Sequence, residues 1–413
     1  MSSLSKKIAI IGGGPSGLYT AEILSRNGYC VELFDQKSSV GRKFLVAGRG
    51  GLNITHSEPV ELFAQRYFST STESMEERWN SALRLFSPLD LKKWVESFGI
   101  ETYIGSSRRV YPQGDSAAKL LLAWVERLKK QGVIFSLKHR WKSFEKKETG
   151  WSLLMDSEAG ERELLFEAVV FAMGGGSWPE TGSDGVWIDS FLNKGIAVTP
   201  LVSANCGWEV AWDSWFLEKF EGKAIKGVEV WSDSSPERRR GDLMVTRYGL
   251  EGGPIYALTR TLREEKEPRI WIDLKPDLSK EELQKRYRIQ RGFLKDIEKS
   301  WNLNSLSKGL LLRSNPDRNL ATFLDLVKGL SIKLKGPRAL QEAISSAGGV
   351  RGEGLNEVGM ICQYPGLFCV GEMLDWEAPT GGYLLQGCFS GATVTAAGVD
   401  RYLTHFPFKQ EGT

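Results

Sequence analysis

The chain has 413 residues, enough for two or three domains, and its 41% hydrophobic and 25% charged residues are typical of a globular protein. Its 54 basic and 51 acidic residues nearly balance, so the overall charge gives no reason to expect a nucleic acid or an anionic membrane as partner. The N-terminal apolar run is too short for a signal peptide or membrane span and the five cysteines lack metal-ligand spacing, so we expect a cytoplasmic protein with reduced thiols and no metal site.

A glycine-rich turn near the N-terminus carries the most specific signal of the chain. A short apolar strand runs into GGGPSG (12–17), which opens a helical pattern, and a second strand ends at Asp35. In such a strand–helix–strand unit Gly12 permits the tight turn, Gly14 lets the backbone approach a pyrophosphate, and Gly17 lets the helix pack closely. The helix start offers N–H groups to phosphates, and Asp35 can accept hydrogen bonds from a ribose. The unit therefore predicts a dinucleotide site, in which the Asp35 charge disfavours a 2′-phosphate.

The next segments alternate between glycine-rich and periodic stretches. Residues 41–56 hold too many glycines and too little periodicity for a helix or strand, so we expect a loop there. The following patterns predict helices at about 74–98 and 116–131, a pair of strands at 133–138 and 151–155, and a further strand at 168–172. The last strand ends in a second glycine turn, and ligands of open α/β folds bind at such strand ends.

The middle of the chain changes character. Residues 191–275 contain short, alternating, tryptophan-rich segments, which predict antiparallel strands. The three arginines at 238–240 lie in a polar stretch of this region, and we expect them in a solvated loop. Residues 276–329 show a charged helical pattern, and a strand at 330–334 returns to the β-rich region.

The pattern of the first domain returns near the C-terminus. A strand leads into Gly371 and Glu372, and a glycine pair at 381–382 opens a small-residue helix that again presents N–H groups toward a ligand. We therefore expect one discontinuous α/β domain built from both ends of the chain. The predicted domains are a dinucleotide domain at 1–190 and 346–413, a β-rich substrate domain at 191–275 and 330–345, and a helical insertion at 276–329.

This layout is that of FAD enzymes with the two-dinucleotide fold of the glutathione-reductase class. The segments GRKFLVAGRGGLNITHSE (41–58), AMGGGSWPETGSDG (172–185), AGGVRGEGLNEVGM (347–360) and VGEMLDWEAPTGGYLLQGCFSGATVTAAGV (370–399) resemble the YhiN-like family of bacterial NAD(P)/FAD-dependent oxidoreductases, which has an aminoacetone-oxidase-like branch. The resemblance covers essentially the whole chain. It implies a Rossmann-like FAD domain, a barrel-like middle domain, a small helical insertion, and an FAD-dependent oxidoreductase.

The resemblance also implies a set of cofactor contacts. The adenosine, phosphate and ribityl parts of FAD would contact Gly12, Gly14, Pro15, Ser16, Gly17, Asp35, Gln36, Arg42, Lys43, Trp141, Gly174, Gly371 and Glu372. The flavin ring would contact Gly48, Gly50, Gly51, Asn53, Gly382, Tyr383, Leu384 and Leu385. A helix start aimed at the pyrimidine edge of the flavin stabilises the negative charge of the reduced ring, so no dyad of catalytic side chains is required.

Arg49, Asn53 and Tyr383 are the candidates for a catalytic role beside the flavin. The alternatives are loop-stabilising hydrogen bonds for Arg49 and Asn53, and packing for Tyr383. We expect a small organic substrate, with NAD(P)H or oxygen as electron partner. Two other functions stay open: a flavin-dependent tRNA-modifying enzyme, against which the missing basic stripe counts, and a non-catalytic redox sensor loaded with flavin.

Overall fold

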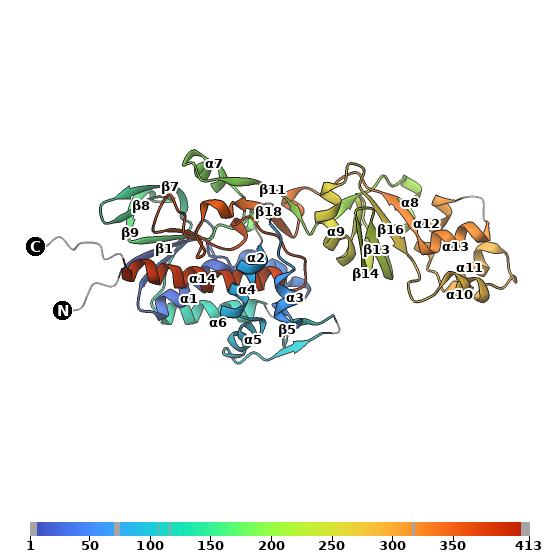
Figure 1. Ribbon diagram of the computed structural model, residues 1–413, viewed down its shortest axis with the longest axis horizontal. Coiled ribbons are helices and arrows are strands. Elements are labelled where there is room, and N and C mark those ends of the chain that lie inside the picture. The colour runs from blue at the N-terminus through green and yellow to red at the C-terminus, as the bar shows by residue number, and fades with distance from the viewer. Residues whose placement is uncertain (1–5, 70–74, 106, 115–116, 316–318, 406–413) are drawn as a thin grey trace, which may run out of the picture. The chain divides into compact units, whose positions relative to one another are not determined.

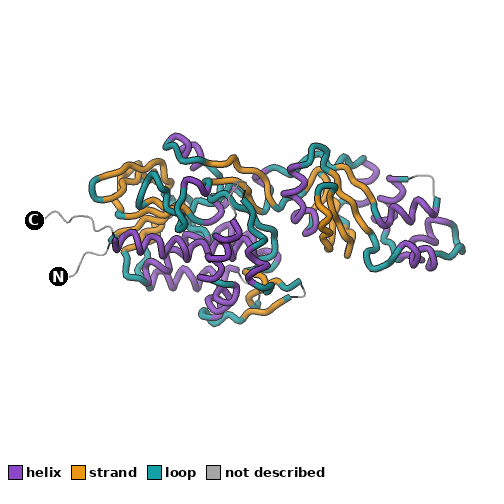
Figure 2. The backbone as a smooth tube through the Cα atoms, in the orientation of Figure 1, coloured by secondary structure: helices purple, strands orange, loops and turns teal. Residues whose placement is uncertain are grey.

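The computed structural model describes residues 6–69, 75–105, 107–114, 117–315 and 319–405. It divides the chain into two units: unit 1 contains Met1–Val202 and Ser345–Thr413, and unit 2 contains Ser203–Ile344. Unit 1 is thus built from both ends of the chain, as the blue and red parts of the ribbon show (Figure 1). Both units mix helices and strands (Figure 2).

A five-stranded parallel sheet lies at the centre of unit 1, in the order β19-β10-β1-β2-β6. Its strands are β1 (Lys7–Ile11), β2 (Cys30–Asp35), β6 (Ile134–Leu137), β10 (Ala168–Phe171) and β19 (Leu367–Cys369). Alternate residues of β1 enter two different apolar clusters, Ile8 and Ile10 on one face and Ala9 and Ile11 on the other. Because both faces are buried, the inner strands are apolar throughout rather than alternating.

Helices and small sheets surround this parallel sheet. The helices of unit 1 are α1 (Pro15–Arg26), α2 (Arg42–Ala47), α3 (Val60–Ala64), α4 (Met75–Leu85), α5 (Pro88–Glu96), α6 (Ala117–Lys130), α7 (Trp187–Asn193) and α14 (Tyr383–His405). The small sheets have the orders β3-β5-β4, β7-β8-β9 and β11-β18. Their strands are β3 (Thr55–His56), β4 (Thr102–Ile104), β5 (Arg109–Pro112), β7 (Arg140–Lys147), β8 (Gly150–Ser157), β9 (Gly160–Phe166), β11 (Val198–Ala204) and β18 (Ser345–Val350).

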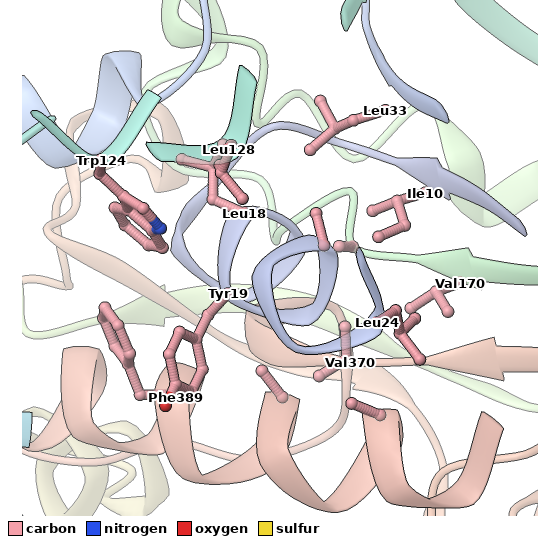
Figure 3. Close-up of a cluster of buried hydrophobic side chains, with 14 of the residues drawn as sticks. Ile10, Leu18, Tyr19, Leu24, Leu33, Trp124, Leu128, Val170, Val370 and Phe389 are labelled. Atoms are coloured by element: carbon pink, nitrogen blue, oxygen red, sulfur yellow. The ribbon is translucent and has the colours of Figure 1, made fainter. Parts of the chain in front are cut away.

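The largest apolar cluster of unit 1 joins the two chain ends. Figure 3 shows Leu18 and Tyr19 of α1 between the sheet residues Ile10 and Val170 and Phe389 of α14. The rings of Tyr19 and Phe389 lie 4.8 Å apart between centroids. Burial of such side chains is the main stabilising contribution to a fold, so α1 and α14 are held together by the same core that covers the sheet.

Unit 2 is built on a six-stranded antiparallel sheet in the order β12-β15-β14-β13-β16-β17. Its strands are β12 (Trp208–Glu209), β13 (Ala224–Ser232), β14 (Ser235–Val245), β15 (Gly249–Glu251), β16 (Arg269–Asp273) and β17 (Leu330–Lys333). The edge of β12 that faces away from β15 is hydrogen-bonded to the segment after β17. Glu209 N donates to Gly336 O at 2.8 Å, and Arg338 N donates to Gly207 O at 2.9 Å. These bonds connect the two ends of the sheet, which gives it a barrel-like form.

The helices of unit 2 belong to two groups. Two lie within the β-rich region, α8 (Ser214–Phe220) and α9 (Gly253–Glu264). Four follow β16 in the chain, α10 (Lys280–Arg286), α11 (Phe293–Trp301), α12 (Ser305–Ser314) and α13 (Leu320–Lys328). Asparagine and serine side chains cap α10, α12 and α13, which explains where these short helices begin. Within the described part of the chain, no helix is both long and apolar enough to cross a bilayer.

Four expectations from the sequence are corrected by the structure. Residues 41–56 are not a loop throughout, because the glycine-free stretch 42–47 forms α2 and residues 55–56 form β3. The helical pattern at 74–98 is two helices, since Ser87 caps a new helix with Pro88 in its first position. The strands expected at 133–138 and 151–155 do not pair, because β6 joins β2 while β8 lies between β7 and β9. The arginines at 238–240 lie on strand β14 rather than in a loop.

Candidate functional site

A pocket lies in unit 1 where the strands of the parallel sheet end at their carboxyl edge. Its empty volume is about 1230 Å³, including space open to solvent. Its lining comes from both ends of the chain: Ile11, Gly12, Gly13, Gly14, Pro15, Ser16, Phe34, Asp35, Gln36, Gly41, Arg42, Lys43, His139, Arg140, Trp141, Lys142, Ala172, Met173, Gly174, Thr181, Gly182, Ser183, Asp184, Val186, Trp187, Ser190, Val370, Gly371, Glu372 and Cys388. All of the residues predicted to contact the adenosine, phosphate and ribityl parts of FAD are in this lining except Gly17.

The glycines of the first turn have different physical roles. Gly12 has φ +110°, and a Cβ there would lie 2.3 Å from Ala172 O. A Cβ on Gly17 would lie 2.0 Å from Gly12 O, so both positions require glycine for the fold itself. Gly14 is different, since a Cβ there would meet no protein atom within 4 Å. Its missing side chain leaves open space beside the uncapped start of α1, where a phosphate can approach the backbone.

Asp35 lies in the pocket wall and already accepts two hydrogen bonds. Its Oδ2 accepts from Gly13 N at 2.9 Å, and its Oδ1 accepts from Lys37 N at 2.8 Å. Burial raises the pKa of Asp35, and these bonds oppose the shift. A carboxylate has about four acceptor sites, so two remain for ribose hydroxyls. The neighbouring Gln36 is engaged with the protein, because its Nε2 donates to Gly182 O at 2.8 Å and its Oε1 accepts from Arg140.

An ion pair joins the two ends of the chain in the pocket. Lys43 Nζ lies 2.7 Å from Glu372 Oε2 and donates to Ser177 Oγ at 2.6 Å. The other oxygen of Glu372 accepts from Ser346 N at 3.1 Å. Both charged residues were predicted as cofactor contacts, and the structure makes them partners of each other. Arg42 is half-buried in the same lining, so it adds positive charge on the side expected for the phosphates.

Three buried polar atoms of the pocket lining have no hydrogen-bond partner in the described residues: Ser16 Oγ, Trp141 Nε1 and Ser183 Oγ. Buried polar groups in proteins are nearly always hydrogen-bonded, so such atoms are sites for a ligand. Ser16 lies beside Gly371, where a Cβ would be 2.4 Å from Ser16 Oγ. Together with the open space at Gly14, these donors and acceptors fit the phosphates and hydroxyls of a dinucleotide.

The start of α14 lies directly against β3. Gly382 has φ +96°, and a Cβ there would be 2.4–2.6 Å from the backbone of Thr55. Thr55 Oγ1 donates to Gln386 Oε1 at 2.7 Å, which fixes the first turn of the helix on this strand. The helix start and the loop before β3, which were both predicted to approach the flavin, are therefore brought together although over 300 residues separate them.

A charged cluster at this helix start was not predicted. Tyr383 Oη donates to Glu58 Oε1 at 2.6 Å, and the Arg66 guanidinium binds both oxygens of Glu58 at 3.0 and 3.2 Å. Burial raises the pKa of Glu58, but the hydrogen bonds from Arg66 and Tyr383 outweigh it and lower this pKa overall. Burial and the bond to Glu58 raise the pKa of Tyr383. Glu58 is the last residue of the motif at 41–58. Its place in that motif was the one signal in the sequence that could have identified Glu58 as a site residue.

The remaining residues predicted at the flavin do not line the pocket. Asn53 Oδ1 is buried without a partner in the described residues, whereas Arg49 is exposed on the short 3₁₀ turn Gly48–Gly50. A Cβ on Gly48 would collide with Ala117 at 2.4 Å, so packing already explains that glycine. A Cβ on Gly50 would meet nothing within 4 Å, and one on Gly51 would lie 3.7 Å from the ring of Tyr111. Leu384 and Leu385 are half-buried against two apolar clusters.

A pocket at the carboxyl edge of a parallel sheet, with a glycine turn at a helix start and a carboxylate at the end of the second strand, is typical of a dinucleotide-binding protein. Residues 6–398 match the family model of the HI0933-like protein Rossmann domain, so the chain belongs to this family, which confirms the resemblance seen in the sequence. The fold and the family make it an FAD-dependent oxidoreductase. When bound, FAD accepts and donates a hydride or an electron pair.

Three relatives cover nearly the whole chain. The 3-dehydro-bile acid delta(4,6)-reductase of Clostridium scindens is 25% identical over 407 residues, which are 92% of this chain and 95% of that protein. The ribosomal RNA dihydrouridine synthase of Escherichia coli is 25% identical over 406 residues, 94% and 96% of the two chains. A protein of the same name from Haemophilus influenzae is 22% identical over 97% of this chain and 100% of its own length.

Solved structures show the same fold at low identity. The 3-ketosteroid-delta4-(5alpha)-dehydrogenase of Rhodococcus jostii RHA1 has a TM-score of 0.53 and 14% identity, with 97% of this chain and 98% of that chain covered. A flavocytochrome c3 fumarate reductase has a TM-score of 0.51 and 13% identity, with 97% and 79% covered. These structures support the fold of an FAD enzyme.

Proposed function

We propose that this enzyme reduces a carbon–carbon double bond that is conjugated with a carbonyl group. One observation carries the proposal: the names of two relatives, each 25% identical over more than nine-tenths of both chains, describe this one chemistry. A delta(4,6)-reductase of a 3-dehydro-bile acid removes double bonds next to a ketone. A dihydrouridine synthase saturates the double bond of uracil, which is conjugated with a ring carbonyl.

The reaction requires a hydride on the β-carbon and a proton on the α-carbon, while the carbonyl group takes the negative charge between the two steps. NADH or NADPH would supply the hydride and bound FAD would carry it. We assign the binding of FAD to the residues of the pocket, with its phosphates at Gly14 and Ser16 and its ribose at Asp35. Unit 2 would contribute to substrate recognition.

We also assign Tyr383 a holding role rather than a proton-donating one. Its hydroxyl proton is directed to Glu58 at 2.6 Å, and its pKa is raised, so the proton is not directed toward a substrate. Asn53 is the better candidate for a contact with cofactor or substrate, because its buried Oδ1 has no partner in the described residues and can accept a hydrogen bond.

A uridine in RNA is the second candidate for the substrate, after a small conjugated ketone. It is favoured by two relatives named ribosomal RNA dihydrouridine synthases, each of which covers more than nine-tenths of the chain. Both substrates present a carbon–carbon double bond beside a carbonyl group, so the reaction is common to the two candidates and only the recognition of the substrate differs.

A stopped-flow experiment tests the reaction class. The FAD-loaded protein is reduced without oxygen by NADH or NADPH, then mixed with cyclohexenone, a steroid enone, a uridine-containing RNA, or cyclohexene as the matched control without a carbonyl. We expect the absorbance of oxidised flavin to return with at least one conjugated compound and not with cyclohexene. Reoxidation by none of the conjugated compounds, or equal reoxidation by cyclohexene, would contradict the proposal.

A further inference from the structure

Six basic side chains are exposed on α10, α11 and the loop between them, in unit 2. They are Lys285, Arg286, Arg288, Arg291, Lys295 and Lys299, and we call them the cationic face. None of them forms an ion pair with another residue that the structure describes. Acidic residues of the same segment offset part of this charge, because Glu281 lies near Lys285 and Asp296 near Arg291, while Glu298 pairs with Lys308. Residues 280–299 contain seven basic and four acidic residues, so the segment keeps a net positive charge.

A second basic run in the same unit provides a contrast. The arginines of β14 form the ion pairs Arg238–Glu229 at 3.5 Å, Arg239–Glu237 at 2.5 Å and Arg240–Asp277 at 2.5 Å. Each arginine of that run thus has a carboxylate of the protein beside it. The overall charge of +3 conceals this difference, because it averages a neutralised run and an unpaired one.

The loop of the cationic face is held in a fixed shape. The carboxylate of Asp296 accepts from the backbone N–H groups of Gln290, Arg291 and Gly292 at 2.9–3.1 Å, and these bonds lower its pKa. On the other side of the loop, the ring of Tyr287 lies against the buried Trp301, with 6.4 Å between the ring centroids. Between these anchors Ile289 is 83% exposed, an unusual position for a large apolar side chain.

We propose that the cationic face binds RNA through its phosphate backbone, with Ile289 in contact with a sugar or a base. Lysine and arginine side chains contribute most of the affinity of proteins for nucleic acids, because they neutralise phosphates and release counterions. The inference rests on the proposed function, since it gives the RNA-borne uridine a place to be recognised. It differs from the sequence-based expectation, which rested on the charge of the whole chain and not on this segment.

The test measures binding of a fluorescein-labelled RNA stem–loop with uridines in its loop, by anisotropy, to the full-length FAD-loaded protein in a series of KCl concentrations. The variant R286Q/R291Q/K295Q removes three charges of the cationic face. The control R238Q/R239Q/R240Q removes three charges from β14. Thermal melts followed by circular dichroism establish that both variants are folded.

We expect wild-type affinity to fall steeply with salt. The cationic-face variant should bind at least about tenfold more weakly near physiological salt, and its slope of log affinity against log salt should be smaller by about 2–3, or 0.7–0.9 for each lost phosphate contact. The control should bind within roughly twofold of the wild type, since its arginines are occupied by carboxylates.

Three results would overturn the RNA proposal: no RNA binding by the wild type, an equal effect of the two variants, or charge-dependent binding to phosphatidylserine vesicles with none to RNA. Stopped-flow reoxidation of the same proteins by cyclohexenone or a steroid enone separates the two proposals. Charge-dependent RNA binding by a protein that reduces no conjugated compound would leave the cationic face supported and refute the reaction class. Reduction of enones by a protein whose cationic-face variant binds RNA as tightly as the wild type would support the reaction class and refute the cationic face as an RNA site.

Discussion

Two glycines of the first turn, Gly14 and Gly17, differ in the space available for a side chain. A Cβ on Gly14 meets nothing, and its φ of −79° and ψ of 179° suit alanine, whereas a Cβ on Gly17 would collide with a backbone oxygen. We expect Gly14→Ala to leave the apoprotein as stable as the wild type, or up to about 1 kcal/mol more stable. It should weaken FAD binding roughly tenfold or more, since about 1.4 kcal/mol of steric cost suffices.

Gly17→Ala is the matched variant. We expect it to lower the free energy of unfolding of the apoprotein by about 1–3 kcal/mol, because the backbone must move to admit the methyl group. Urea unfolding of the apoproteins and titration with FAD separate the two effects. Wild-type FAD affinity in Gly14→Ala would refute the assignment of this position to the phosphates.

The bond from Tyr383 to Glu58 predicts a pH-dependent contribution to stability. The pKa of Glu58 lies below the ordinary glutamate value of 4.5, so its charged form is stabilised in the folded protein. That stabilisation is complete above pH 4.5 and is lost as pH falls through the lowered pKa. Tyr383→Phe removes one donor to this buried carboxylate, and we expect it to cost about 1.5–3 kcal/mol at neutral pH.

The control for this variant is Tyr67→Phe, which removes a neutral hydrogen bond of 2.8 Å from Tyr67 Oη to Tyr383 O. Its cost should be about 0.5–1.5 kcal/mol and should not change between pH 7 and pH 4. Urea unfolding across that pH range measures both. If the cost of Tyr383→Phe stayed constant as the pH was lowered, the described role of Glu58 would be wrong.

At the scale of elements, the sequence predicted what is encoded locally. The parallel strands and both glycine turns depend on apolar runs and on glycine spacing within a few residues, and they lie where the pattern placed them. Helix α2 was missed because its six residues stand between glycines, which hid the pattern. The partners of Tyr383 could not be predicted, since Glu58 lies 325 residues away and no local pattern encodes that contact. The same reason applies to the pair of Lys43 and Glu372.

The first turn of α14 depends on the close contact between Gly382 and β3. Gly382→Ala would push the helix start away from β3, because φ is +96° and Thr55 backbone atoms lie within 2.6 Å of the added Cβ. We expect this variant to lower the free energy of unfolding by about 1–3 kcal/mol and to weaken the binding of FAD. The control is Gly391→Ala in the same helix, where the nearest atom to the added Cβ is 3.9 Å away and where alanine should stabilise by up to about 1 kcal/mol. Equal behaviour of the two variants would contradict the packing described here.

At the scale of the whole molecule, the apolar clusters follow the division into units. One large cluster lies entirely within residues 206–343, and the other three lie in unit 1. Because unit 2 has its own core and its sheet is connected end to end, we expect residues 203–344 to fold when expressed alone, without FAD. Circular dichroism and a cooperative thermal transition would show this. A fragment without a cooperative transition would mean that the core of unit 2 is not sufficient for folding.

We propose that both ends of the chain build one FAD site. Titration of the wild-type apoprotein with FAD, followed by visible absorbance and tryptophan fluorescence, tests it most directly when Gly14→Ala and Gly382→Ala are titrated alongside. We expect saturation at one FAD per chain for the wild type, and weaker binding when either end is altered. Failure of the wild type to take up FAD, or full affinity in both variants, would contradict it.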